Sequence, residues 1–269
     1  MNKEEYREFK RQERAEVFNT LSEATQGLLS ADKLKEYADM QAKLSGLSAS
    51  NVLLVMEQKP EASWVRTFDD WKGDNVSLKK GERGILTLAP DYYQKPDGTT
   101  GRGVKVVRVF DISQTTAENR AINRPIYRGA TEMLMECWPK TVEVPELLGG
   151  ETAFYDPQKK TIFLKEGLDP DTKFFMLARE HAVAIETKGD ILTRDEVIGK
   201  TEFSAYLVTK RYGMNPPDID FANMVDSFRG REEKDVREEL GGMRFTADRI
   251  HQKVQEQLEQ NRETKGMER

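Results

Sequence analysis

The chain has 269 residues, enough for one large domain or two ordinary ones, and its 37% of hydrophobic residues suffice for a core. A formal net charge of −5 excludes a molecule that attracts nucleic acid over its whole surface, so such binding requires a local basic patch. A single cysteine, Cys137, excludes an internal disulfide and suits a reducing compartment. The sequence has neither a signal-peptide core nor an apolar run of membrane-spanning length. We therefore expect a cytoplasmic protein with no membrane partner.

The first part of the chain predicts helices followed by a small sheet. Apolar residues recur at helical spacing and predict helices over residues 3–29, 31–46 and 51–58. The next segments are rich in β-branched residues and are separated by turns that contain Gly, Asp and Pro. They predict strands over residues 63–68, 84–90 and 104–112. This pattern indicates a helical arm with a small antiparallel sheet, and thus an α+β fold.

A second region follows a polar, irregular stretch over residues 117–130 that is typical of a linker. The pattern predicts a helix over 128–138, then a β-hairpin in "TAFYDPQKKTIFLKEG" with Asp156 and Pro157 in its turn. Two helices are expected next, over residues 171–187 and 193–213. The second region is thus a helical domain that contains a β-hairpin.

The charged tail predicts a helix with one narrow apolar stripe. The stripe residues alternate by four and three: Val236, Leu240, Met243, Ala247, Ile250 and Val254. We expect the stripe to dock on its own domain, with dimerisation as the alternative, although Gly241 and Gly242 interrupt a long coiled coil. The oligomeric state stays open.

The helix "MLAREHAVAIETKGD", residues 176–190, has the rhythm of a zinc-protease helix without its ligands. In an H-E-x-x-H helix two histidines four residues apart share one face, beside a glutamate that acts as general base. If Glu180 were that base, the histidines would stand at positions 179 and 183, which hold Arg179 and Val183. His181 points roughly opposite to position 179. We therefore expect no metal, no cofactor and no catalytic residue, and the stretch by itself indicates a core helix.

Several uncommon features recur in one order over residues 30–116. They are an N-x-L-L-x-x-x-Q-x-P helix end in "NVLLVMEQKP", a tryptophan followed by lysine, the turn "KKGERGI" and the strand end "VFDISQT". This order resembles the N-terminal domain of ArdC-type antirestriction proteins, which mobile genetic elements carry. The resemblance implies a domain that binds single-stranded DNA.

The same family places a zincin-like metallopeptidase domain after the first, and a weaker likeness extends to it. A later family helix supplies a glutamate ligand ahead of an A-Y pair, and "TEFSAYLVTKRYG" places Glu202 there. The first-helix positions fall on Arg179, Glu180 and Val183, so both histidines are missing. The resemblance implies a pseudo-metallopeptidase, not an enzyme, in which Arg179 stands where the metal stood. We expect Arg179 to lie within about 6 Å of the Glu202 carboxylate.

A local basic excess marks the candidate nucleic-acid-binding segment. Residues 59–108 hold ten Lys and Arg against seven Asp and Glu, an excess of three, with aromatic residues among them. A single-strand binder needs a basic groove and aromatic faces on which bases stack. Our candidates for these contacts are Lys59, Arg66, Trp71, Lys79, Lys80, Arg83, Tyr92, Tyr93, Arg102, Lys105 and Arg108. Trp64, Phe68 and Trp71 could equally serve the core of the sheet.

Together these observations divide the chain into three parts: residues 1–120 as an ArdC-like single-stranded-DNA-binding domain, 121–217 as a degenerate zincin-like domain, and 218–269 as a charged helical tail. The expected function is that of a non-enzymatic mobile-element protein that binds single-stranded DNA and counters host defence. A host defence protein is a further expected partner. The alternatives are an interaction or inhibitor protein that uses the pseudo-peptidase scaffold without binding DNA, and a residual hydrolase that uses Glu180.

Overall fold

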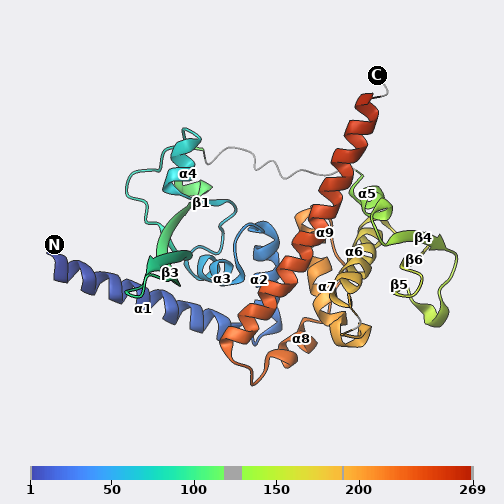
Figure 1. The fold of residues 1–269 in the computed structure, drawn as a ribbon, viewed down its shortest axis with the longest axis horizontal. Coiled ribbons are helices and arrows are strands. Elements are labelled where there is room, and N and C mark those ends of the chain that lie inside the picture. The colour runs from blue at the N-terminus through green and yellow to red at the C-terminus, as the bar shows by residue number, and fades with distance from the viewer. Residues whose placement is uncertain (1, 118–128, 190, 268–269) are drawn as a thin grey trace. The chain divides into compact units, whose positions relative to one another are not determined.

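The computed structural model describes residues 2–117, 129–189 and 191–267 and confirms the α+β class (Figure 1). Residue contacts divide the chain into two compact units, Met1–Ile122 with Val225–Glu238 and Asn123–Met224 with Glu239–Arg269. Residues 225–238 of the expected tail belong to the first unit, and residues 239–269 belong to the second. The predicted linker lies almost entirely outside the described residues.

Three helices begin the first unit: α1 (Lys3–Gly27), α2 (Ala31–Lys43) and α3 (Ala49–Gln58). The Asn2 side chain caps α1, where it accepts hydrogen bonds from the backbone of Glu4 and Glu5. Only the second half of α1 contributes a buried stripe, through Val17 and Leu21. The first half of α1 therefore lies largely in solvent.

The sheet of the first unit contains β1 (Val65–Thr67), β2 (Ile85–Gln94) and β3 (Thr100–Asp111) in the order β1-β3-β2. All its pairings are antiparallel. The strand predicted over residues 63–68 ends at Thr67, because Thr67 and Asp70 form a capping box that starts helix α4 (Phe68–Gly73). A short 3₁₀ helix, η1 (Ile112–Gln114), follows β3.

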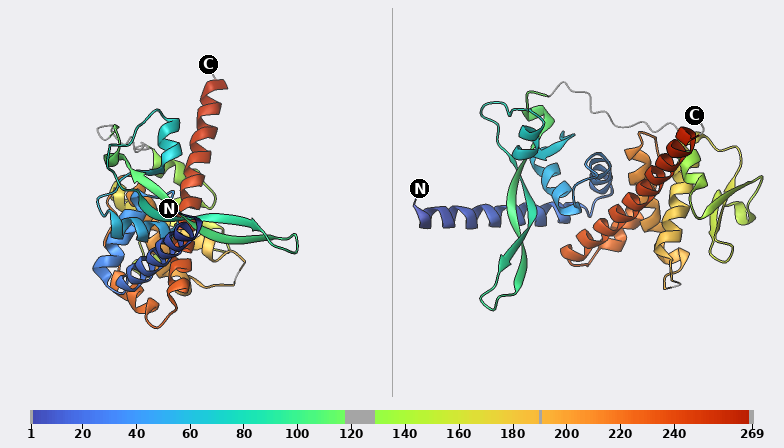
Figure 2. Two further views of the ribbon diagram at one scale, coloured as in Figure 1. Left: turned by 90° about the vertical axis from the view of Figure 1, so that its left-hand side faces the viewer. Right: turned by 45° about the horizontal axis from the view of Figure 1, so that its top comes forward.

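Strands β2 and β3 form a long hairpin whose far half projects from the unit. Its register runs from Ile85 opposite Val109 to Gln94 opposite Thr100. Both views of Figure 2 show the hairpin crossing α1 and extending beyond it. The near half contains the buried strand residues Ile85, Thr87 and Val109, whereas residues 92–100 are all exposed. The far half therefore gains little from burial and presents both of its faces to solvent.

The second unit combines a small mixed sheet with two long helices. Its elements are α5 (Ala130–Glu136), β4 (Lys140–Val144), η2 (Leu148–Gly150), β5 (Ala153–Asp156), β6 (Thr161–Lys165), α6 (Pro170–Glu186) and α7 (Arg194–Arg211). The predicted hairpin is present as β5 and β6, and β4, which the sequence did not predict, pairs parallel to β6. Helix α6 packs against α5, α7 and strands β5 and β6. This packing places the middle of α6 at the centre of the unit.

The last helices are α8 (Phe221–Phe228) and α9 (Glu233–Met267). All six residues of the predicted apolar stripe on α9 are buried within the chain, as expected for a stripe that docks on its own protein. Helix α9 continues through Gly241 and Gly242, where an interruption was expected. In the described ranges no helix is both long and apolar enough to cross a bilayer.

Candidate functional site

The motif residues of α3 hold the outer edge of the hairpin. The Asn51 side-chain amide exchanges two hydrogen bonds with the backbone of Leu88, each 2.9 Å long. Seven residues on, the Gln58 amide does the same with Leu86, at 2.9 and 2.8 Å. Strand β2 lies at the edge of its sheet, where backbone groups otherwise lack partners. The N-x-L-L-x-x-x-Q pattern is thus explained by pairing of the sheet edge.

The "FDISQT" motif joins the end of β3 to two loops. Asp111 is buried, and its carboxylate accepts hydrogen bonds from the backbone N–H groups of Ser63, Trp64 and Ser113 at 2.7, 2.9 and 2.9 Å. Burial alone would raise the pKa of Asp111, but these hydrogen bonds hold it below its ordinary value. Gln114 donates to the Arg83 carbonyl at 2.8 Å and so anchors the basic turn. These motif residues build the scaffold.

Trp71 does not fit its predicted role as a stacking surface. Its side chain is only 1% exposed and packs with Val76, Phe110 and Ile112 in a hydrophobic cluster. Its indole N–H donates to the Phe110 carbonyl at 2.9 Å. A buried ring cannot offer a face to a base, so we remove Trp71 from the candidate set.

Several of the candidate basic residues have partners within the first unit. Lys59 pairs with Glu61, Arg66 with Asp74, Lys105 with Asp91 and Arg108 with Glu13. Arg66 also lies over the rings of Trp64 and Trp71, and Lys79 donates to the Ser113 carbonyl. Among the described side chains, Lys80, Arg83 and Arg102 have no acidic partner and remain available to an anion.

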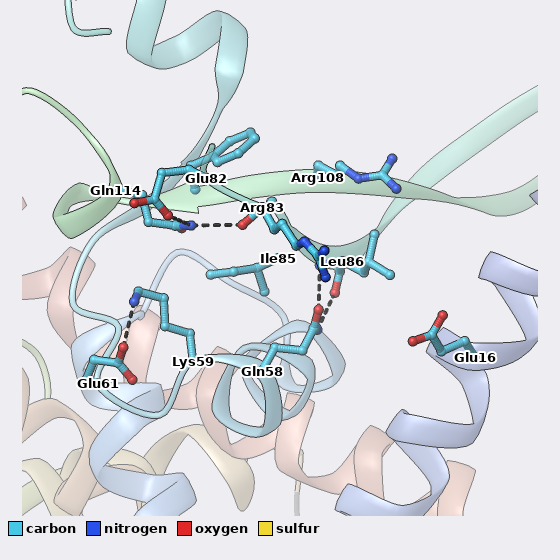
Figure 3. Close-up of a pocket in the computed structure, with 12 residues that line it drawn as sticks. Glu16, Gln58, Lys59, Glu61, Glu82, Arg83, Ile85, Leu86, Arg108 and Gln114 are labelled. Carbon is cyan, nitrogen blue, oxygen red and sulfur yellow. Dashed lines mark hydrogen bonds and ion pairs between the residues drawn. The ribbon is translucent and has the colours of Figure 1, made fainter. Parts of the chain in front are cut away.

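Three candidates line one hollow of about 760 Å³, shown in Figure 3. They are Lys59, Arg83 and Arg108, and they come from the end of α3, the turn before β2 and strand β3. Three carboxylates share the lining: Glu16, Glu61 and Glu82. Because acidic and basic side chains balance, the hollow is polar without being a strong anion site.

Tyr92, Tyr93 and Arg102 lie on the far half of the hairpin, whereas Lys79 and Lys80 lie in the turn before β2. Tyr92 is 64% exposed and lies directly across from Arg102 on β3. Tyr93 is 51% exposed, but its ring packs over Gly101, where an added Cβ would stand 2.5 Å from the ring. Tyr92 therefore has the freer ring face, and Arg102 places a cation beside it.

In the second unit, the carboxylate of Glu180 is enclosed by hydrogen-bond donors. Its side chain is fully buried and accepts from Arg179 Nε at 2.9 Å and from the Tyr155 backbone N–H at 2.8 Å. Arg194, the first residue of α7, adds a two-pronged contact at 2.5 and 2.8 Å. Burial alone would lower the pKa of Arg194, but the hydrogen bonds and charge of Glu180 raise it. Sequence reasoning missed Arg194, which neither a motif nor a spacing singles out.

The expected contact between Arg179 and Glu202 is confirmed. Arg179 Nη1 lies 3.6 Å from Glu202 Oε1. Burial raises the pKa of the Glu202 carboxyl, and the Arg179 charge opposes that rise. Arg179 thus bridges Glu180 and Glu202, while Val183 contributes a buried apolar side chain.

The same cluster also covers the outer edge of β5. The Thr152 carbonyl accepts a hydrogen bond from the Lys165 N–H, so Thr152 faces β6 with its backbone groups. In an antiparallel pair every second residue does so, and the N–H and C=O groups of Ala153 and Tyr155 therefore point away from β6. Arg179 Nη2 donates to the Ala153 carbonyl at 3.2 Å, and the Tyr155 N–H donates to Glu180. These edge groups therefore already have partners and are not open to an added peptide strand.

His181 is separate from this cluster. Its ring lies on the side of α6 that faces α5, with Nε2 3.0 Å from the Leu134 carbonyl. Burial lowers the pKa of His181 to about 3, which keeps the ring neutral. Across residues 2–117, 129–189 and 191–267, no three His, Cys, Asp or Glu side chains come together as a metal site.

No protein-family model and no curated protein sequence matches the chain. Two crystal structures of the antirestriction protein ArdC from plasmid R388 are similar to it, each at 14% sequence identity. The metal-free structure has a TM-score of 0.51 and covers 77% of this chain and 85% of ArdC. The Mn(II)-bound structure has a TM-score of 0.58 and covers 88% of this chain and 97% of ArdC. The chain therefore has the fold of ArdC-type antirestriction proteins, as its sequence motifs predicted.

Proposed function

We propose that this chain is a non-enzymatic, antirestriction-type protein of a mobile genetic element and that its first unit binds single-stranded DNA. The fold shared with ArdC supports the antirestriction role. The observation that carries DNA binding is the exposed pair of Tyr92 and Arg102 on the projecting hairpin. A base stacked on an aromatic side chain contributes about 1–3 kcal/mol, and a neighbouring cation can meet the phosphate.

The position of this pair suits a single strand better than a duplex. The Tyr92 ring projects from a hairpin whose residues 92–100 are all exposed, so an unpaired base can reach it. The bases of a duplex are stacked on one another, and a lone ring can reach their faces only after they unstack. Single-strand binding by stacking also tolerates any sequence, because every base has a π-face.

We infer that the second unit is a pseudo-peptidase. ArdC is known in an Mn(II)-bound structure, but the residues at the corresponding positions here do not fit a cation. Arg179 places a positive charge between Glu180 and Glu202, and Val183 offers no ligand atom. The Glu180 carboxylate is already held by two arginines and one backbone N–H, so it is not free to accept a proton from water.

The test of DNA binding is fluorescence anisotropy with a labelled single strand of roughly 30 nucleotides. We expect Tyr92→Ala and Arg102→Ala each to weaken binding. Phe68→Ala is the matched control, because it removes a ring that is 50% exposed elsewhere in the same unit. Equal affinity of the three variants and the wild type would remove the hairpin from the binding site.

A second candidate function is the binding of a host defence protein by the second unit. Ile191 is 85% exposed and Leu192 is 39% exposed, and both lie within three residues of Arg194, which contacts the Phe154 ring. Exposed apolar residues beside a covered cluster are typical of a protein contact. Antirestriction activity that is lost in Ile191→Asp but kept in Tyr92→Ala would favour this candidate over DNA binding.

A further inference from the structure

The first half of α1 separates its charges onto two sides. At 3.6 residues per turn, all five basic residues from the start of the helix to Arg14 fall within a sector of about 100°. They are Lys3, Arg7, Lys10, Arg11 and Arg14, and we refer to them as the basic face. The acidic residues Glu4, Glu5, Glu8 and Glu16 lie outside this sector, and Glu13 is buried. The basic face runs for about 16 Å along the helix axis.

The crossing of α1 with the hairpin shows where the basic face is directed. Glu13 pairs with Arg108 on β3, and Arg14 Nη1 donates to the Val104 carbonyl at 2.6 Å. Arg108 therefore meets α1 at Glu13, which is outside the basic face. Val104, four residues closer to the far end of the hairpin, meets α1 at Arg14, which belongs to the basic face. The basic face is therefore on the side of α1 toward which the far half of the hairpin projects.

Tyr92 and Arg102 lie on the hairpin face that α1 crosses. Side chains two residues apart in a strand share a face, so Arg102 lies on the same face as Arg108, which contacts α1. Tyr92 is its cross-strand partner on that face. The far hairpin and the basic face consequently meet as the two walls of a corner, with Arg14 and Val104 at its base.

Exposed aromatic residues accompany these cations on α1. Tyr6 and Phe18 are 50% and 39% exposed and project beside or within the basic face, whereas Phe9, which is 46% exposed, projects on the acidic side. Lys10 lies over the rings of Tyr6 and Phe9, and Arg14 lies over Phe18. Alternating cations and rings are the combination that contacts the phosphates and bases of a single strand.

We propose that the basic face of α1 is the second wall of the single-stranded DNA site, opposite Tyr92 and Arg102. This inference rests on the proposed function and adds contacts that the segment over residues 59–108 does not contain. Lys3 and Arg7 have no acidic partner among the described side chains, so they are free to meet phosphate. The hollow of Figure 3 is outside this path, because Glu16, on the acidic side of α1, lines it.

The test compares two charge reversals on helices of the same unit. Arg7→Glu changes the basic face, and Lys33→Glu changes an exposed site on α2 by the same charge. For single strands, log affinity falls with log salt by about 0.7 for each phosphate contacted. We expect Arg7→Glu to weaken binding to the labelled single strand and to lower that slope by about 0.7, and Lys33→Glu to change neither. The neutral double variant Lys3→Gln with Arg7→Gln removes two contacts without introducing repulsion, so it should also weaken binding and lower the slope by about 1.4.

The outcomes separate this inference from the function on which it rests. If Tyr92→Ala weakens binding while both α1 variants match the wild type, the basic face is not part of the site and the hairpin remains. A wild type that does not bind single-stranded DNA overturns both. A slope lowered equally by Lys33→Glu also overturns the inference, because the effect would then be one of overall charge.

Discussion

Replacing Arg194 tests whether the arginines of the second unit compensate a buried charge. Arg194 supplies two of the hydrogen bonds that Glu180 accepts, at 2.5 and 2.8 Å, and Glu180 is fully buried. In Arg194→Leu the carboxylate keeps only Arg179 and the Tyr155 N–H. Removing one partner of a buried ion pair costs about 3–5 kcal/mol, because the remaining charge is left without full compensation. We expect a loss of that size in the free energy of unfolding of this unit.

Hydrogen–deuterium exchange at α6 measures this loss within the second unit alone. Two units can unfold separately, so a signal averaged over the whole chain does not give one free energy. At about 1.4 kcal/mol per factor of ten, exchange across residues 170–186 should become faster by roughly two to three and a half orders of magnitude.

The second arm of the experiment is a double-mutant cycle. Glu180→Gln removes the charge but keeps a carbonyl oxygen for the Tyr155 N–H. In that background Arg194→Leu should cost at least about 2 kcal/mol less than in the wild type. An equal cost in both backgrounds would refute the reasoning, because Arg194 would then stabilise by packing and not by compensating the charge of Glu180.

Three further predictions follow from individual contacts. Arg179→His with Val183→His introduces two imidazoles beside Glu202, at the positions where the proposed pseudo-peptidase lacks its ligands. We expect this variant to bind one Mn(II) per chain by calorimetry, and an unchanged heat signal would contradict that proposal. The pKa of Asp111 is lowered in the folded protein, so its contribution to stability is present above the unfolded value of about 3.9 and is lost as pH falls through the folded value. In Asp111→Asn the free energy of unfolding, followed by tryptophan fluorescence, should therefore fall less steeply as the pH is lowered. An unchanged pH dependence would count against this. Asn51→Ala leaves two backbone groups of β2 without partners, so the free energy of opening across residues 85–94 should fall by about 1–3 kcal/mol. Hydrogen exchange there should become faster, and an unchanged exchange rate would exclude edge pairing.

Much of the fold was predictable because the motifs consist of structural residues. Asn51, Gln58 and Asp111 each make contacts that only an amide or a carboxylate can make, and these contacts hold the β2–β3 sheet together. The order of these motifs therefore predicted the fold. It predicted DNA binding less well, since the side chains of these residues are used within the protein and are not available to DNA.

Tertiary packing accounts for several misses. Glycine pairs cost a helix roughly 1 kcal/mol per residue, but Leu240 and Met243 on either side are buried and offset this cost in α9. Strand β4 pairs parallel with β6, and a parallel pairing has no turn to signal it. A tryptophan in the sequence is compatible with stacking on bases and with packing in a core, so only the burial of Trp71 in the structure decided between the two.

The candidate sites were predictable in part. The spacing of Arg179, Glu180 and Glu202 predicted their proximity, because the family helices align them. Arg194 could not be found this way, since its contact with Glu180 depends on how α7 begins beside α6. The basic face of α1 was visible in the sequence. A helical projection of charged residues reveals it, whereas a projection of apolar residues alone does not.

The most direct test of the account is the affinity of the whole protein for a labelled single strand and for the duplex of the same length, at about 50 and 200 mM salt. We predict tighter binding to the single strand, with affinity that falls as salt rises, because exposed cations and rings flank one another on the first unit. Equal binding to both forms, or no binding to the single strand at low salt, would contradict a single-stranded DNA site on this fold.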